Sequence, residues 1–141
     1  MIEISLEPIH PEVIINKVKS DSSGCVVTYV GLIREESLGR QVLAVEYQDY
    51  NGKAASVLKK MAIEAKQRWQ VNDIAICHRV GKLKVGDVNL VVAVAATHRS
   101  EGFAVCQYII DQFKHKLPTQ KKETYSDSNI QTAVTGDTSL F

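Results

Sequence analysis

The sequence predicts an α+β protein in which helices cover a mainly antiparallel sheet. Strand-like and helix-like segments follow one another in the order β-α-β-β-α-β-β-α-β. Twice, two strand-like segments are joined by only a short loop, which favours antiparallel hairpins over the crossovers of a doubly wound fold. With 141 residues, 45% of them hydrophobic, the chain is long enough for one domain with a real core.

Four segments make up the first half of this order. Residues 2–7 alternate between apolar and polar and predict a first strand. Residues 10–20 predict a short helix that has Pro11 near its start. Residues 25–33 are β-branched and aromatic, and residues 42–50 alternate again, so both segments predict strands. We expect these last two strands to pair with each other as a hairpin.

The middle of the chain carries the clearest helix. Apolar residues recur at helical spacing through residues 52–70. Two strands are expected after it, at 73–81 and 87–97, joined by the turn-like segment "KLKVG". The second of them is almost entirely apolar, which predicts a place at the centre of the sheet.

A third helix is expected at residues 100–116, with Ser100 as its N-cap. Pro118 stops this helix because the residue before a proline avoids the helical region. Residues 121–126 predict a last strand. We therefore expect one domain over residues 1–126, followed by a loosely ordered tail over residues 127–141.

Charge and hydropathy exclude several classes of function. The chain has 17 Lys and Arg against 16 Asp and Glu, so its formal net charge is +1 and it has no global field for nucleic acid or a membrane. An RNA-binding role is disfavoured further because no surface of interleaved aromatic and basic residues is readable. The longest apolar run, around residues 90–96, is too short to span a bilayer.

The cysteines and the N-terminus favour the cytoplasm. Cys25, Cys77 and Cys106 lie far apart among apolar neighbours, a pattern typical of buried, reduced thiols. Residues 1–13 carry acids and prolines and do not resemble a secretory signal. Neither a phosphate-binding glycine loop nor a metal-spaced cluster nor a Ser-His-Asp set is readable, so no cofactor and no metal is expected.

Two places collect positive charge where an anion could bind. His98 and Arg99 stand where the apolar strand ends and the third helix begins. The second place is "FKHKLPTQKKE", in which Lys114 and Lys121 lie on either side of Pro118. Because the chain must turn at the proline, the two amines could face one pocket. The alternative is that the lysines of the last helical turn only offset the helix dipole.

Two further charged positions have both a functional and a structural interpretation. Arg34 ends the strand that contains Gly31, either as a solvated strand end or as a guanidinium fork for a phosphate or carboxylate. His78 and Arg79 repeat the His-Arg pair, but they precede a turn rather than a helix. For that second pair a structural role is favoured.

A run of motifs now resembles a known family. The strings "GLIR", "LAVEYQDY", "ICHRVGKLKVGD", "AATHRSEGF" and "FKHKLPTQKKE", in this order and spacing, resemble the catalytic (large) subunit of molybdopterin synthase. The resemblance runs from about Gly24 to about Glu123. Each motif alone is weak, whereas the combination is specific.

The resemblance implies a fold, partners and a reaction. It implies a hammerhead-type α/β fold, a homodimer, and a small ubiquitin-like carrier subunit whose C-terminus is a Gly-Gly thiocarboxylate. The reaction is transfer of sulfur to cyclic pyranopterin monophosphate to form molybdopterin. The resemblance places the catalytic role on Lys114 and Lys121. It places substrate binding on a further set of residues: Leu32, Ile33, Arg34, His98, Arg99, Lys122 and Glu123.

The sequence departs from the family pattern before the second lysine. Many members have aromatic residues there, whereas this chain has Thr119 and Gln120. The tail after Glu123 also lacks the usual tryptophan. A non-catalytic module that docks an acidic or Gly-Gly protein tail through the same basic pocket is therefore the alternative function.

The expected third helix separates the two basic places. At about 1.5 Å per residue, His98 and Arg99 lie about 22 Å from Lys114 along the helix axis. They cannot line one small pocket of a single chain. We therefore expect a two-fold dimer that brings His98 and Arg99 of one subunit to Lys114 and Lys121 of the other.

Overall fold

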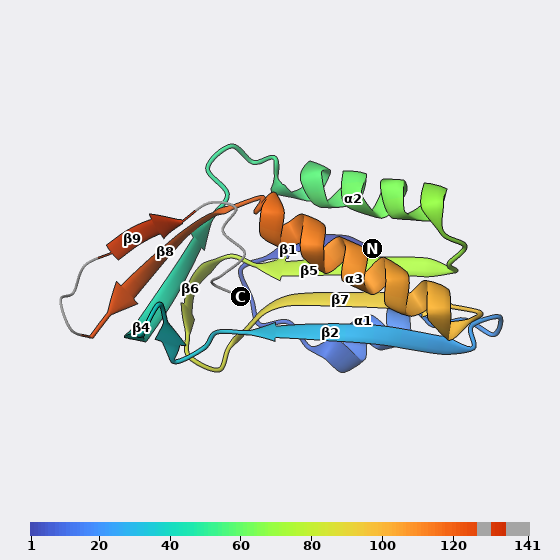
Figure 1. Cartoon of the computed structure of the whole chain (residues 1–141), viewed down its shortest axis with the longest axis horizontal. Coiled ribbons are helices and arrows are strands. Elements are labelled where there is room, and N and C mark those ends of the chain that lie inside the picture. Colours follow the sequence, from blue (N-terminus) through green and yellow to red (C-terminus); the bar gives the residue numbers. More distant parts are fainter. Residues whose placement is uncertain (127–130, 135–141) are drawn as a thin grey trace.

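The computed structural model describes residues 1–126 and 131–134 of the chain. Over these residues three α-helices and nine β-strands form an α+β fold, as the sequence predicts (Figure 1). Pairing is mostly antiparallel, but the strands form two sheets rather than one. The expected tail, 127–141, lies largely outside the described residues, and its residues 131–134 form a strand.

The first sheet has the order β1-β5-β7-β2. Strand β7 (Val88–Ala96) lies between β5 (Asp73–Arg79) and β2 (Cys25–Leu32), antiparallel to both. Strand β1 (Ile2–Ser5) pairs with β5 in parallel. The central position expected for the apolar segment 87–97 is confirmed, and β7 is buried along almost its whole length.

The second sheet is built around β4 (Arg40–Gln48) and β8 (Gln120–Tyr125). The other members are short: β3 (Glu36–Ser37) and β6 (Gly81–Lys84) pair with β4, and β9 (Gln131–Val134) pairs with β8. Strand β6 belongs to the segment that we expected to be only a turn. It carries the chain from the first sheet to the second.

The expected hairpin between the segments 25–33 and 42–50 is wrong. Strand β2 pairs with β7, and β4 belongs to the other sheet. The reason is a tight turn at Leu38 and Gly39, which have φ values of 54° and 76°. Two successive positive φ values are typical of a hairpin turn, so β4 folds back on its neighbour β3. This local hairpin carries β4 away from β2.

The helices cover the first sheet on both faces (Figure 1). Helix α1 (Pro11–Val18) packs on one face, over Val91, Ala93 and Ala95 of β7. Helices α2 (Ala54–Arg68) and α3 (Arg99–His115) lie on the other face, where Leu90, Val92 and Val94 belong to the larger core cluster. Alternate side chains of β7 thus belong to two separate hydrophobic cores.

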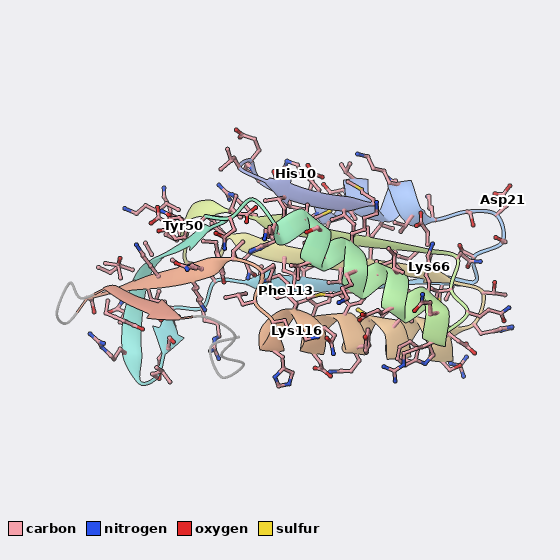
Figure 2. The ribbon with its side chains drawn as sticks, turned by 90° about the horizontal axis from the view of Figure 1, so that it is seen from above. His10, Asp21, Tyr50, Lys66, Phe113 and Lys116 are labelled. Atoms are coloured by element: carbon pink, nitrogen blue, oxygen red, sulfur yellow. The ribbon has the colours of Figure 1, made fainter. Side chains whose placement is uncertain are left out.

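Helix α3 places its C-terminal end where the two sheets meet, as Phe113 and Lys116 show in Figure 2. It begins one residue earlier than expected. His98 occupies the N-cap position without a side-chain cap, and the Ser100 hydroxyl bonds to Glu101 instead, so the expectation that Ser100 caps the helix is wrong. No described helix has both the length and the apolar composition needed to cross a membrane.

Candidate active site

A small recess lies at the junction of the two sheets. Its volume is about 20 Å³. The end of β2, strand β4 and strand β8 surround it. The structure brings together in its lining several of the residues that the sequence singles out, namely Leu32, Ile33, Arg34, Lys121 and Glu123.

A buried ion pair forms one wall of the recess. Lys121 Nζ lies 3.1 Å from Glu123 Oε1, and the two side chains are only 4% and 2% exposed. Glu123 also accepts hydrogen bonds from the Tyr125 hydroxyl at 2.7 Å and from the Ser37 hydroxyl at 3.4 Å. Both oxygens of the carboxylate are therefore engaged, which holds Lys121 in place from within the protein.

Two tyrosine rings accompany the lysines. Lys121 Nζ lies 5.9 Å from the centre of the Tyr47 ring, and Lys114 Nζ lies 6.0 Å from the centre of the Tyr29 ring. Burial raises the pKa of Tyr47 well above its ordinary value, so this hydroxyl stays protonated. Burial also raises the pKa of Tyr29, and the charge of Arg34 partly opposes that rise.

The structure does not place Lys114 in the recess. It lies in the last turn of α3 and is not part of the lining. The Tyr29 ring next to it reaches the position of Gly31, where a Cβ atom would lie 3.4 Å from the Tyr29 hydroxyl. The same position is 2.8 Å from the Asn89 side chain, which does line the recess. The Tyr29 ring thus lies near both Lys114 and Gly31, and the position of Gly31 adjoins Asn89 of the recess.

The recess opens toward an arginine. Arg34 and Glu36 line both the recess and an open hollow of about 440 Å³, which Glu35 and Leu38 complete. A larger cavity of about 660 Å³ lies on the α2 side of the link between α3 and β8. That cavity contains neither Lys114 nor Lys121, so its size does not make it the better candidate for the predicted chemistry.

The remaining predicted residues lie elsewhere in the single chain. Lys122 alternates with the buried Lys121 and Glu123 along β8, and it does not line the recess. His98 and Arg99 are exposed at the opposite end of α3. That helix has 17 residues, which agrees with the separation of about 22 Å expected from the sequence.

A buried histidine, for which the sequence favoured a structural role, supports the site. His78 lies between the rings of Tyr47 and Phe113, with centroid distances of 4.9 and 5.0 Å. Its Nδ1 lies 2.9 Å from the Asn89 carbonyl oxygen and its Nε2 lies 2.8 Å from the Thr119 hydroxyl. Burial lowers the pKa of His78 to about 4, so the ring is neutral. It ties the first sheet to the segment that carries Lys121.

This histidine also accounts for the departure before the second lysine. Thr119 is 3% exposed, and its hydroxyl meets His78. The segment in front of Lys121 is therefore fixed by a hydrogen bond rather than by a large aromatic side chain. The only sequence signal was the "HRVG" string, which does not reveal a partner 41 residues away.

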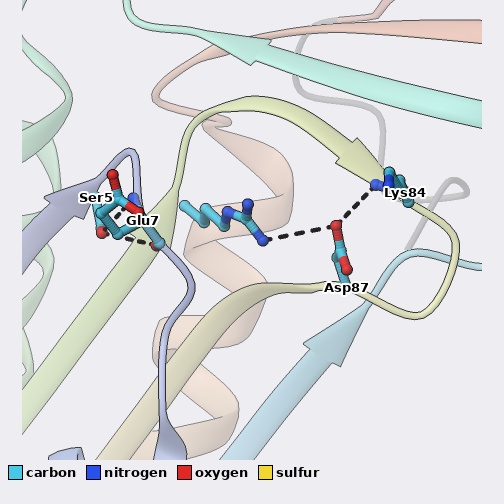
Figure 3. A network of polar contacts seen from close by, with 5 residues as sticks. Ser5, Glu7, Lys84 and Asp87 are labelled. Carbon is cyan, nitrogen blue, oxygen red and sulfur yellow. Dashed lines mark hydrogen bonds and ion pairs between the residues drawn. The ribbon is translucent and has the colours of Figure 1, made fainter.

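The neighbouring Arg79 has a structural role. As Figure 3 shows, the Asp87 carboxylate accepts the Lys84 N–H at 2.9 Å and pairs with the Arg79 guanidinium at 3.6 Å. Gly86, with φ of 89°, completes the turn between β6 and β7. The "GD" of the motif therefore shapes a turn.

The fold and the site define a class of protein: an α+β domain with a lysine buried at a sheet junction behind an arginine-lined mouth. Residues 4–116 match the family model described as MoaE protein. The chain therefore belongs to the MoaE family, and the resemblance read from its motifs is confirmed.

Similar proteins agree with this assignment. A molybdopterin synthase catalytic subunit from a Nostoc species is 38% identical over 127 residues, which cover 89% of this chain and 74% of that protein. The corresponding subunit from Thermoplasma volcanium is 34% identical, with 91% and 93% covered. The crystal structure of molybdopterin synthase from Staphylococcus aureus superimposes with a TM-score of 0.85 at 29% identity, with 92% and 95% covered.

Proposed function

We propose that this chain is the sulfur-transferring subunit of a molybdopterin synthase and that the recess is its active site. The thiocarboxylated Gly-Gly end of a small carrier subunit enters the recess, and its sulfur passes to cyclic pyranopterin monophosphate. The observation that carries the proposal is the buried Lys121 held by Glu123 directly behind the mouth at Arg34. Membership of the MoaE family supports it.

Electrostatics explains why such a site needs several cations. Both reactants are anions, and two unit charges about 4 Å apart repel by about 4 kcal/mol at an effective dielectric constant near 20. Because Glu123 neutralises much of the charge of Lys121, that ammonium acts mainly as a directional hydrogen-bond donor. Arg34 and Lys114 then supply the further cations that hold the two anions, in a mouth that Glu35 and Glu36 also line.

The same groups suit the chemical step. When the thiocarboxylate sulfur forms a bond to a carbonyl carbon of the pterin side chain, the electron pair of the carbon–oxygen π bond moves onto the oxygen. Water must then cleave the acyl carbon–sulfur bond of the resulting thioester, which leaves the sulfur on the pterin and returns the carrier tail as a carboxylate. A fixed ammonium next to the pterin side-chain oxygen stabilises the charge more in the transition state than in the ground state. We assign this role to Lys121 or Lys114, with Arg34 as a binding group for the phosphate.

A two-fold dimer would complete the site. Strand β2 pairs on one side with β7, and the other edge has no partner strand within residues 1–126 and 131–134. Apolar side chains are exposed nearby: Val30 is 38%, Leu32 is 56% and Phe103 is 61% exposed. Exposed apolar groups along a free edge are typical of a contact surface.

Antiparallel pairing of two β2 edges would give the expected arrangement. The start of β2 lies beside the end of β7, because Cys25 pairs with Ala96, close to His98. A two-fold axis across β2 brings the start of one β2 next to the end of the other. The partner subunit's His98 and the partner subunit's Arg99 then approach the recess at Arg34.

A sulfur-transfer assay with thiocarboxylated carrier and pyranopterin tests the proposal. We expect Lys114→Ala and Lys121→Ala each to abolish most of the turnover. Lys116→Ala is the matched control, because Lys116 is an exposed lysine at the same helix end and does not line the recess. Turnover that is unchanged in both Lys114→Ala and Lys121→Ala would contradict the proposal.

Mixed dimers test the shared site separately. A Lys114→Ala chain combined with an Arg99→Ala chain should restore one working site in each mixed dimer, because both defects then fall in the same composite site and the other site is intact. No recovery of activity in the mixture would count against sharing.

The docking module remains the alternative outcome. Carrier binding without any turnover in the wild type would favour it, whereas the curated relatives are named as catalytic subunits. We also place the protein in the cytoplasm. All three cysteines are free thiols, which fits a reducing compartment.

A further inference from the structure

A β-bulge interrupts the central strand of the first sheet beside the recess. In the pairing of β2 with β7, Gly31 lies opposite Leu90, but the next residue, Leu32, lies opposite Val88. Asn89 is therefore the extra residue, without a partner on β2. Bulges of this kind re-aim a side chain and are common next to active sites.

The bulge changes the face to which Asn89 points. By alternation Asn89 would lie with Val91 and Ala93, which pack toward α1. Instead its Nδ2 donates a hydrogen bond to the Tyr47 hydroxyl at 3.1 Å, on the side of the second sheet. Asn89 is 1% exposed and lines the recess together with Lys121 and Glu123.

The other end of the Asn89 amide is unsatisfied. Its Oδ1 is buried and has no hydrogen-bond partner among the described residues. Gly31 leaves room for this oxygen, because a Cβ atom at residue 31 would lie 2.8 Å from it. A buried carbonyl oxygen without a partner is costly for a folded protein, and such groups are rare in native structures. Asn89 Oδ1 is therefore available to accept a hydrogen bond from a donor that enters the recess.

We propose that Asn89 Oδ1 binds the last peptide N–H of the carrier tail, an inference that rests on the proposed function. The recess of about 20 Å³ holds only a group as small as a peptide N–H and excludes a pterin ring, while the rest of a side-chain-free chain end would lie in the adjoining hollow of about 440 Å³ at Arg34 and Glu36. A thiocarboxylate carries only acceptors, for which Lys121 is the donor. The peptide N–H of the same glycine, two bonds back from the thiocarboxylate carbon, is a donor, and Glu123 has both of its oxygens engaged.

The asparagine thereby fixes the rotation of the tail. With the N–H held on Asn89 and the terminal group on Lys121, the final glycine is attached at two points. Two-point attachment orients the sulfur toward the mouth at Arg34, where the second reactant has room. Asn89 is thus a substrate-positioning residue, and the bulge near the start of β7 turns its side chain into the recess.

Replacing one peptide N–H by oxygen tests this contact directly. We would titrate the full-length protein with an acetylated, fluorescent hexapeptide that ends in Gly-Gly, and with its analogue in which the last amide is an ester. In the wild type we expect the ester to bind about fivefold to tenfold more weakly, as for the loss of one neutral hydrogen bond. In Asn89→Leu the two peptides should bind equally.

Two further variants separate the contact from a structural effect. Tyr47→Phe removes the side-chain bond of Asn89 but keeps Oδ1, so the amide-to-ester difference should persist. Asn89→Asp keeps an acceptor oxygen and should also preserve the difference in affinity between amide and ester, although its charge weakens the binding of both peptides. Thermal unfolding of each variant verifies that it is folded.

The outcomes distinguish this inference from the proposed function. If the ester peptide binds the wild type as tightly as the amide peptide, Asn89 does not bind the tail. The same conclusion follows if the loss of affinity on going from amide to ester is equal in the wild type and in Asn89→Leu. The volume of the recess would then suit one water on Oδ1. In that case peptide binding that is lost in Lys121→Met still supports the active site. If neither peptide binds the wild type at millimolar concentration, both proposals are wrong.

Discussion

The buried His78 predicts that the protein loses stability in mild acid. The ring is enclosed by Tyr47, Phe113, Thr119 and Asn89. Burial lowers its pKa from 6.5 to about 4, while the backbone bond to Asn89 and the charge of Asp49 oppose the shift. The folded state therefore resists a proton that the unfolded chain accepts readily.

The sign and size follow from the two pKa values. Because the pKa is lower in the folded state, the stability is fully present above about pH 6.5 and is lost as the pH falls toward 4. Between pH 7 and pH 5 the unfolded chain gains most of one proton and the folded protein gains almost none. The free energy of unfolding should fall by about 2 kcal/mol over this interval, with about 3 kcal/mol as the limit at lower pH.

Urea unfolding at pH 7 and at pH 5 measures this difference. The comparison is His78→Gln, which keeps hydrogen-bonding groups at the position but cannot titrate. The other three histidines are present in both proteins, so their contributions cancel. We expect the pH-dependent loss to shrink by about 2 kcal/mol in the variant. The same loss in both proteins would refute the assignment of His78 as the buried, neutral group.

Three further changes give defined outcomes. Glu123→Gln leaves Lys121 buried without its counter-charge, so the free energy of unfolding in urea should fall by about 3 kcal/mol. The control is Glu12→Gln at an exposed position, and a smaller fall in Glu123→Gln than in this control would contradict the pairing. Thr119→Val removes the partner of His78 and should cost about 1–3 kcal/mol, whereas Thr119→Ser, which keeps the hydroxyl, should retain most of the stability; equal losses would show that the hydroxyl is not responsible. Gly31→Ala should displace the Asn89 oxygen and weaken binding of the Gly-Gly hexapeptide several-fold. In an Asn89→Ala background the same change should weaken binding much less. Additive effects of the two substitutions on affinity would rule out this clash.

Periodicity and turn chemistry predicted the elements better than their partners. The three helices and the buried central strand were readable because each has a strong apolar pattern over many residues. The β2–β4 hairpin was wrong because Leu38 adopts a positive φ, a conformation that its residue type does not suggest. Strand β6 was missed because four residues between two turns carry too little pattern, and its partner β4 is distant in sequence.

The site was predictable only where its residues are close in sequence. Residues 32–34 and the pair Lys121 and Glu123 come from short motifs, and the structure places them in one recess. Ser37, Tyr47, His78 and Asn89 come from other strands and meet them only through the folding of the two sheets. Asn89 was hidden for a further reason, since an isolated polar residue in an apolar strand does not reveal the bulge that turns it.

Helix α3 has a consequence for the proposed dimer as a whole. It carries Lys114 in its last turn and begins directly after His98, so a single rigid rod would end in two different reaction centres. Any shift of the rod along its axis when one centre is occupied must also move a residue of the other. The two centres are then mechanically connected, and their titration with carrier should depart from that of independent, identical sites.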